Sequence, residues 1–254
     1  MNEFLTGFLS NDSAFGRFMG KFWIIIAANL AFVVFSLPLV TIGPGLVALY
    51  HVMLKTVYGD AQSIRPFKEF WIGFKSNFKQ AILVWLVVVG LAVLVYFDAR
   101  FCDYQGGIMI YFKYAVFAAG LIALIIFLYL LPVMAAFADT IPHLIRNALY
   151  FAVRRPLKLI VIVFFDVFPL YLTYTDAQFR PLYVFIWAMC GFGALAMLGS
   201  SLLIKDFKPY LDASRKKRAE EAKEAGEPEE DPLAMMAEED EASVMDDLRK
   251  MDGL

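Results

Sequence analysis

Six long apolar segments alternate with shorter polar loops along most of this chain. At about 1.5 Å of rise per helical residue, a segment of about 20 residues crosses a hydrocarbon core of about 30 Å. Because a backbone in lipid must satisfy its own hydrogen bonds, the segments have to be helices. The pattern predicts an all-α fold, a polytopic membrane helix bundle, with segments at about residues 22–42, 44–58, 81–97, 108–133, 157–174 and 182–204.

The second segment is short, because residues 44–58 would make a helix of only about 22 Å. It also carries His51 and Lys55. Either it crosses a thinned region with Lys55 reaching the surface, or it is one arm of a re-entrant hairpin. A dense set of helix breakers predicts a hinge before it, at Pro38, Gly43, Pro44 and Gly45.

Composition and loop charge support a multi-pass protein and orient it. Hydrophobic residues make up 60% of the chain and charged residues 19%, which is atypical of a soluble domain. Basic residues concentrate in residues 59–80, in residues 134–156 and after residue 204, whereas the alternate loops are nearly bare. The positive-inside rule therefore places the basic loops and both termini in the cytoplasm. We favour six crossings over five, because five would put the N-terminus outside.

Two basic loops contain amphipathic segments. Aromatic residues recur at helical spacing between residues 67 and 78, and residues 141–153 follow a similar pattern. Each reads as a helix lying in the headgroup region, or as a docking surface for a cytoplasmic partner, and the two roles are compatible. The partner-docking candidates are Phe67, Phe70, Trp71, Phe74, Lys75 and Arg146.

The composition changes after Leu211, which divides the chain into a membrane bundle (1–211) and an acidic cytoplasmic tail (212–254). Residues 215–254 hold 14 acidic and 7 basic side chains. We expect most of the tail to be disordered, with a short helix after Asp231 and Pro232. The tail is either a solvated linker or a segment that contacts a basic cytoplasmic surface.

Motifs for chemistry are scarce. The chain has no Gly-rich nucleotide loop, no G-x-S-x-G and no H-E-x-x-H. Its two histidines stand in different segments without a zinc-site pattern, and we place Cys102 in an outer loop and Cys190 within the sixth span. We therefore expect no enzyme, no cofactor, no metal site and no nucleic-acid partner.

Three polar residues fall inside apolar segments: Asp166, Asn29 and His51. An ionised carboxylate at the depth of Asp166 costs about 2.5–3.5 kcal/mol on insertion scales. It is either a proton or substrate group in a cavity, or a structural hydrogen-bonding group whose partner is Asn29 or a tyrosine. The third alternative is that the span is out of frame and Asp166 lies nearer an interface. Asn29 is the more ordinary type of polar contact between helices.

The first hairpin carries a resemblance to a known family. Residues 36–44 (SLPLVTIGP), followed by Ala48-Leu49-Tyr50, resemble the first hairpin of the YesL-like membrane proteins of Gram-positive bacteria. Residues 67–81 and Arg146-Asn147-Ala148 resemble later segments, so the similarity covers about residues 1–211. The family is one of unknown function, whose genes often neighbour carbohydrate ABC importers and polysaccharide-degrading enzymes. The resemblance implies a protein of the bacterial cell membrane that helps sugar uptake, with no assigned catalytic residues.

Two functional hypotheses follow. The first is a non-catalytic membrane accessory protein that assists a carbohydrate (oligosaccharide) ABC importer by binding its permease subunits. The second is an independent small-solute carrier or channel that uses the intramembrane carboxylate of Asp166. A sensor that signals through its tail is a weaker third.

Overall fold

The structure is a computed structural model that describes residues 14–59, 64–137 and 139–225. Every regular element in these residues is helical, and six of the helical stretches are long and apolar enough to cross a membrane. This confirms the all-α, polytopic prediction. The elements in chain order are α2 (Ala14–Phe35), η1 (Leu39–Thr41), α3 (Ile42–Tyr58), α4 (Pro66–Gln105), α5 (Met109–Ala136), α6 (Ile141–Arg154), α7 (Pro156–Thr175), α8 (Arg180–Ile186), the π-helix η3 (Trp187–Gly191) and α9 (Phe192–Ala225).

Helix α3 is the centre of the fold, because it packs against α2, α4, α5 and α9. Twelve of its 17 residues are buried. Gly73 of α4 allows one close approach, since a Cβ there would lie 2.8 Å from the Cβ of His51. Gly43 allows another, since a Cβ there would collide with the side chain of Trp85. Together with η1, α3 forms a 20-residue apolar stretch, Leu39–Tyr58, which reaches the length of a full span.

The break before α3 lies earlier than the glycines and proline predicted. The chain turns at residues 36–38, and the Thr41 hydroxyl donates to the carbonyls of Phe35 and Pro38 at 2.5 and 2.7 Å. Pro38 therefore lies in the turn, as expected. Gly43, Pro44 and Gly45 were wrongly assigned to the hinge: they form the buried first turns of α3. Proline fits there because the first-turn N–H groups of a helix have no intrahelical acceptor.

Helix α4 has 40 residues, so it is about 60 Å long, twice the thickness of a hydrocarbon core. Its first part packs on α2 and α3, and its apolar second part pairs with α5. The amphipathic segment at 67–78 was predicted as a helix in the headgroup region that leads directly into the third span. The structure has one continuous helix over both, because Lys75 and Lys79 interrupt the apolar pattern without breaking the helix.

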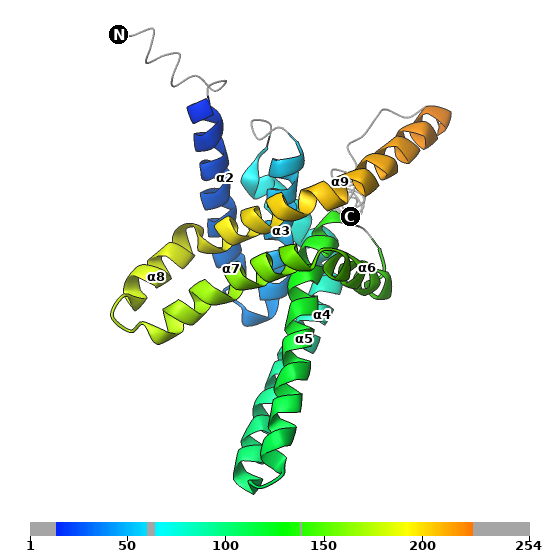
Figure 1. Cartoon of the computed structure of the whole chain (residues 1–254). Helices are drawn as coiled ribbons and strands as arrows, with labels where there is room; N and C mark the ends of the chain where they lie inside the picture. Colours follow the sequence, from blue (N-terminus) through cyan, green and yellow to red (C-terminus); the bar gives the residue numbers. More distant parts are fainter. Residues whose placement is uncertain (1–13, 60–63, 138, 226–254) are drawn as a thin grey trace, which may run out of the picture.

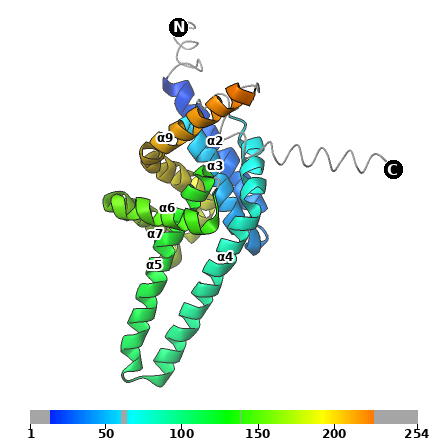
Figure 2. The ribbon, with the colours of Figure 1, turned by 90° about the vertical axis from the view of Figure 1, so that its right-hand side faces the viewer.

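Two hairpins leave the central helices in different directions. Figures 1 and 2 show α4 and α5 extending together away from α2 and α3. Figure 1 shows α7 and α8 projecting to one side, with α9 returning beside them. Both hairpins are poorly covered, since only 11% of the α4 apolar window and 6% of the α7 window are buried.

The turn of the α4–α5 hairpin is made by Gly106 and Gly107, whose φ angles of 65° and 58° favour glycine. Beyond it, Lys113 pairs with Asp103 at 2.7 Å. Cys102 was wrongly placed in an outer loop. It lies in the last turns of α4 and is only 2% exposed.

The last span and the tail also differ from expectation. The sixth apolar segment is built from α8, η3 and the first part of α9, with a π-helix where a regular helix was expected. Helix α9 then continues past the predicted boundary at residue 211 as far as Ala225. The rest of the acidic tail, with its expected terminal helix, lies outside the described residues.

Candidate functional site

One face of α7 is turned toward the rest of the protein. Ile162 is the one buried residue of this helix, and Asp166, Pro169 and Thr173 follow it at helical spacing with intermediate exposure. The other faces carry large exposed apolar side chains. Asp166 therefore lies on the inward face, as a carboxylate in an apolar segment should.

Polar links at both ends of this face fix α7 against the last span. The Lys158 ammonium donates to Asp206 Oδ2 at 2.6 Å and to the Leu202 carbonyl at 2.8 Å. At the other end, Trp187 Nε1 donates to the Thr173 hydroxyl at 2.9 Å. The two links set an antiparallel register in which Asp166 stands between them.

Asp166 Oδ2 is buried and has no hydrogen-bond partner among the described residues. Tyr50 of α3 interacts electrostatically with this carboxylate. The Tyr50 hydroxyl also lies against α9, since a Cβ on Gly199 would be 3.1 Å from it. The next residue, Ser200, has a buried hydroxyl that is likewise unpartnered in the described part of the chain. Helices α7 and α3 thus bring a carboxylate and a phenol into one region, the central polar region (Asp166, Tyr50).

Asn29 makes polar contacts between helices, as expected, but to groups other than Asp166. Its side-chain amide donates to the carbonyls of Trp187 and Ala188 at 3.0 and 2.8 Å, and its Oδ1 accepts from Gly193 N–H at 2.9 Å. Trp187 and Ala188 are the first two residues of the π-helix η3. Fully buried Asn29 therefore joins α2 to the irregular part of the sixth span.

His51 is also fully buried, but it faces α4. Its Nε2 lies 3.9 Å from Glu69 Oε2, and Lys55 donates to the same oxygen at 2.9 Å. This cluster joins α3 to the first turn of α4. Asn29, His51 and Asp166 therefore have different surroundings: the π-helix, the start of α4 and the central polar region.

The predicted docking residues of α4 divide between two neighbouring faces. Phe70 and Phe74 are buried at 0% and 8% exposure, and both rings pack on Phe35 of α2. They are core residues, so their assignment to a docking surface was wrong. Phe67 and Trp71 are 54% and 44% exposed. Lys75 lies 5.3 Å from the Trp71 ring centroid, a cation–π distance.

We call Phe67, Trp71 and Lys75 the aromatic-basic stripe, because their i, i+4, i+8 spacing places them on one face of α4. Arg146, the last docking candidate, is exposed on α6. Helix α6 begins after Asp139, whose carboxylate accepts from Thr140 N–H at 2.7 Å and lies 3.2 Å from His143 Nδ1. A docking role for the stripe and Arg146 stays a prediction.

Several residues of these clusters were not singled out from the sequence: Tyr50, Glu69, Lys158, Asp206 and Ser200. Lys158 and Asp206 lie at the start and near the end of consecutive apolar segments, and opposite charges at such positions are a usable signal. Tyr50 and Ser200 carry no such signal. Among the described residues, no group of three or more His, Cys, Asp or Glu side chains is arranged to hold a metal ion.

Residues 25–99 are similar to a family whose model is described as "Protein of unknown function, DUF624". The matched region runs from α2 to near the end of α4, so it contains Asn29, His51 and the aromatic-basic stripe. No curated protein and no solved structure matches the chain.

Proposed function

We propose that the protein is a non-catalytic membrane accessory protein that binds the membrane or juxtamembrane part of another protein. The observation that carries the proposal is the aromatic-basic stripe. Aromatic side chains are enriched at interfaces, and tryptophan is among the residues that contribute most of the binding energy there. The stripe lies on the half of α4 that precedes its apolar part, where a cytoplasmic partner is accessible.

The nature of the partner rests on resemblance. The match of residues 25–99 to a family of unknown function supports the broad kinship of the first hairpin. From residues 36–44 we infer the more specific relationship to the YesL-like proteins. From that relationship we infer that the partner is a permease subunit of a carbohydrate ABC importer. In this proposal the protein lies in the plasma membrane of a bacterium with both termini in the cytoplasm.

A paired-variant purification tests the docking role. Phe67→Ala with Lys75→Glu alters the stripe, and Phe101→Ala with Lys205→Glu makes the same changes elsewhere. Phe101 is a fair control because it lies on the same helix and is 56% exposed, against 54% for Phe67. Tagged proteins are extracted in mild detergent, and permease subunits are quantified by mass spectrometry. We expect permease subunits with the wild type and the control, and at least a tenfold loss with the stripe variant.

Equal recovery with both variants would remove the docking role of the stripe. Absence of every transporter subunit from the wild-type sample would remove the importer as partner.

The unpartnered carboxylate of Asp166 favours a second candidate, a small-solute carrier or channel. An uncompensated carboxylate within a membrane segment is a functional-site hypothesis by default. Asp166→Asn removes the charge at nearly constant volume, and Asp98→Asn is the control because Asp98 is exposed on α4. Proton flux into reconstituted vesicles, read with a pH-sensitive dye, should then stop in the first variant alone. Equal flux in both variants would exclude this function.

A further inference from the structure

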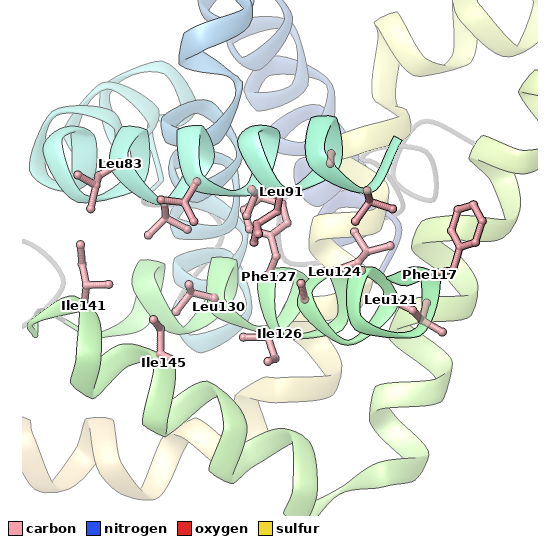
Figure 3. A pocket seen from close by; sticks show the side chains of 17 residues that line it. Leu83, Leu91, Phe117, Leu121, Leu124, Ile126, Phe127, Leu130, Ile141 and Ile145 are labelled. Atoms are coloured by element: carbon pink, nitrogen blue, oxygen red, sulfur yellow. The ribbon is translucent and has the colours of Figure 1, made fainter. Parts of the chain in front are cut away.

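A groove runs between α4 and α5, where the two helices of the hairpin separate. Its volume is about 850 Å³, and its lining is entirely apolar apart from backbone atoms. Figure 3 shows Leu83, Leu91 and Leu124 among the side chains that line it, with Ile141 and Ile145 of α6 at one end. Near the other end α4 and α5 approach closely, since a Cβ on Gly120 would lie 3.2 Å from Val95.

The groove has the length of one lipid leaflet. Its lining on α4 extends from Leu83 to Val95, which is about 18 Å at about 1.5 Å per residue. One leaflet contributes half of a hydrocarbon core of about 30 Å, or about 15 Å. Its volume lies in the upper part of the range of about 300–1,000 Å³ for small-molecule sites, which favours two acyl chains over one.

Positive charge gathers at the end of the groove formed by α6. Lys79 precedes Leu83 by one helical turn, so it stands above the groove on the same face of α4. Arg146 follows the lining residue Ile145. Both side chains are exposed, and within the described residues neither makes an ion pair. The nearby carboxylate of Asp139 is already engaged by Thr140 N–H and His143.

We propose that this groove binds an anionic phospholipid of the leaflet next to α6. Its acyl chains lie between α4 and α5, and its phosphate is held by Lys79 and Arg146. The groove is apolar over the length of one leaflet and has exposed cations at a single end. An anionic phospholipid, which is apolar along its chains and charged at its headgroup, matches both features. The proposal stands independently of the importer hypothesis, because it uses neither the aromatic-basic stripe nor the central polar region.

The test is native mass spectrometry of the full chain in detergent, with added phosphatidylglycerol or phosphatidylcholine. A basic residue near an anionic lipid surface contributes about 1 kcal/mol, or about fivefold in affinity. Lys79→Gln with Arg146→Gln should therefore lower phosphatidylglycerol binding about 25-fold and phosphatidylcholine binding much less, because the choline ammonium already offsets the phosphate charge. The control is Lys205→Gln with Lys208→Gln, two exposed lysines of α9.

A second pair of variants tests the groove itself. Ala92→Phe fills it, whereas Val93→Phe places the same ring on the neighbouring exposed position, which does not line it. Only Ala92→Phe should displace the lipid. Equal binding of the two lipids, or loss in neither or both Phe variants, would overturn the proposal. A protein dimer dissociated by Ala92→Phe would also overturn it, because the occupant would then be a second copy.

Discussion

Replacing Asn29 with alanine should loosen the packing of α2 on the last span. The substitution removes three interhelical hydrogen bonds at once, two donated to the carbonyls of Trp187 and Ala188 and one accepted from Gly193 N–H. All three bonds lie inside the protein, because Asn29 is fully buried. The effect should therefore exceed that of shortening a buried side chain alone.

The magnitude follows from values for membrane proteins. Interhelical hydrogen bonds contribute on average about 0.6 kcal/mol each, with a maximum of about 1.7. Three bonds give about 2 kcal/mol, or about 30-fold in the folding equilibrium, with an upper limit of about 5 kcal/mol. Asn77→Ala is the control, because Asn77 is also buried but bonds only within its own helix, to Gly73 O and Ser76 Oγ.

The assay is reversible unfolding in mixed micelles with increasing sodium dodecyl sulfate, followed by tryptophan fluorescence and circular dichroism. The two variants lose the same side-chain volume, so the difference between them is the contribution of the interhelical bonds of Asn29 less that of the local bonds of Asn77. We expect Asn29→Ala to unfold more easily than Asn77→Ala by up to about 2 kcal/mol. Equal stabilities would refute the reasoning, because the π-helix would then not depend on the Asn29 amide.

Two further predictions address α4. Gly73→Ala should destabilise the protein by about 1–3 kcal/mol in the same assay, because a Cβ there would lie 2.8 Å from the Cβ of His51. The control, Gly90→Ala, should not destabilise it, because a Cβ there would meet open space. Equal effects of the two substitutions would contradict the close approach of α3 to α4. In a variant lacking both native cysteines, Tyr104→Cys should react with an impermeant thiol reagent in intact cells, since Tyr104 is 88% exposed beside the hairpin turn. Reaction only after lysis would reverse the orientation. In the wild type, which keeps its cysteines, buried Cys102 should not react in either state.

The spans could be predicted from the sequence because lipid imposes a length and a composition on each. Residues 157–174 were expected and α7 spans Pro156–Thr175. The limits of α4 could not be found in the same way. Hydropathy falls at Lys75 and Lys79, but lysine is compatible with a helix, so the change in polarity marks the end of the apolar stretch and not the end of the helix.

The direction of each helical face was harder to predict. Phe67, Phe70, Trp71 and Phe74 share one helical pattern, and their spacing alone makes them equivalent. The ring of Phe35 from α2 lies against Phe70, Trp71 and Phe74, yet only Phe70 and Phe74 are buried. A contact made by a residue 35 positions away is tertiary information that periodicity does not contain.

The polar interior was identified only in part. Asn29, His51 and Asp166 could be selected because each interrupts an apolar segment, but their partners could not. The acceptors of the Asn29 amide are backbone carbonyls of a π-helix. The residue types at positions 187–191 do not indicate that a π-helix forms there. Gly193 was the available signal, since any Cβ there would lie 2.8 Å from the carbonyl of Ile25.

The placement of the polar contacts separates structural polar residues from Asp166. Asn29 joins α2 to the π-helix, and the Lys55–Glu69 and Lys158–Asp206 pairs join α3 to α4 and α7 to α9. In each case a buried or half-buried polar group has a partner on another helix, and its presence is explained by that contact. Asp166 lies between two such contacts, faces inward, and has an oxygen without any partner among the described residues.

Replacing Asp166 with a residue that carries no charge should therefore stabilise the fold, because desolvation of an unpaired carboxylate is a cost without a matching hydrogen bond. An Asp166→Asn variant that unfolds more easily than the wild type would contradict this argument, and with it the reason for regarding Asp166 as anything other than a structural residue.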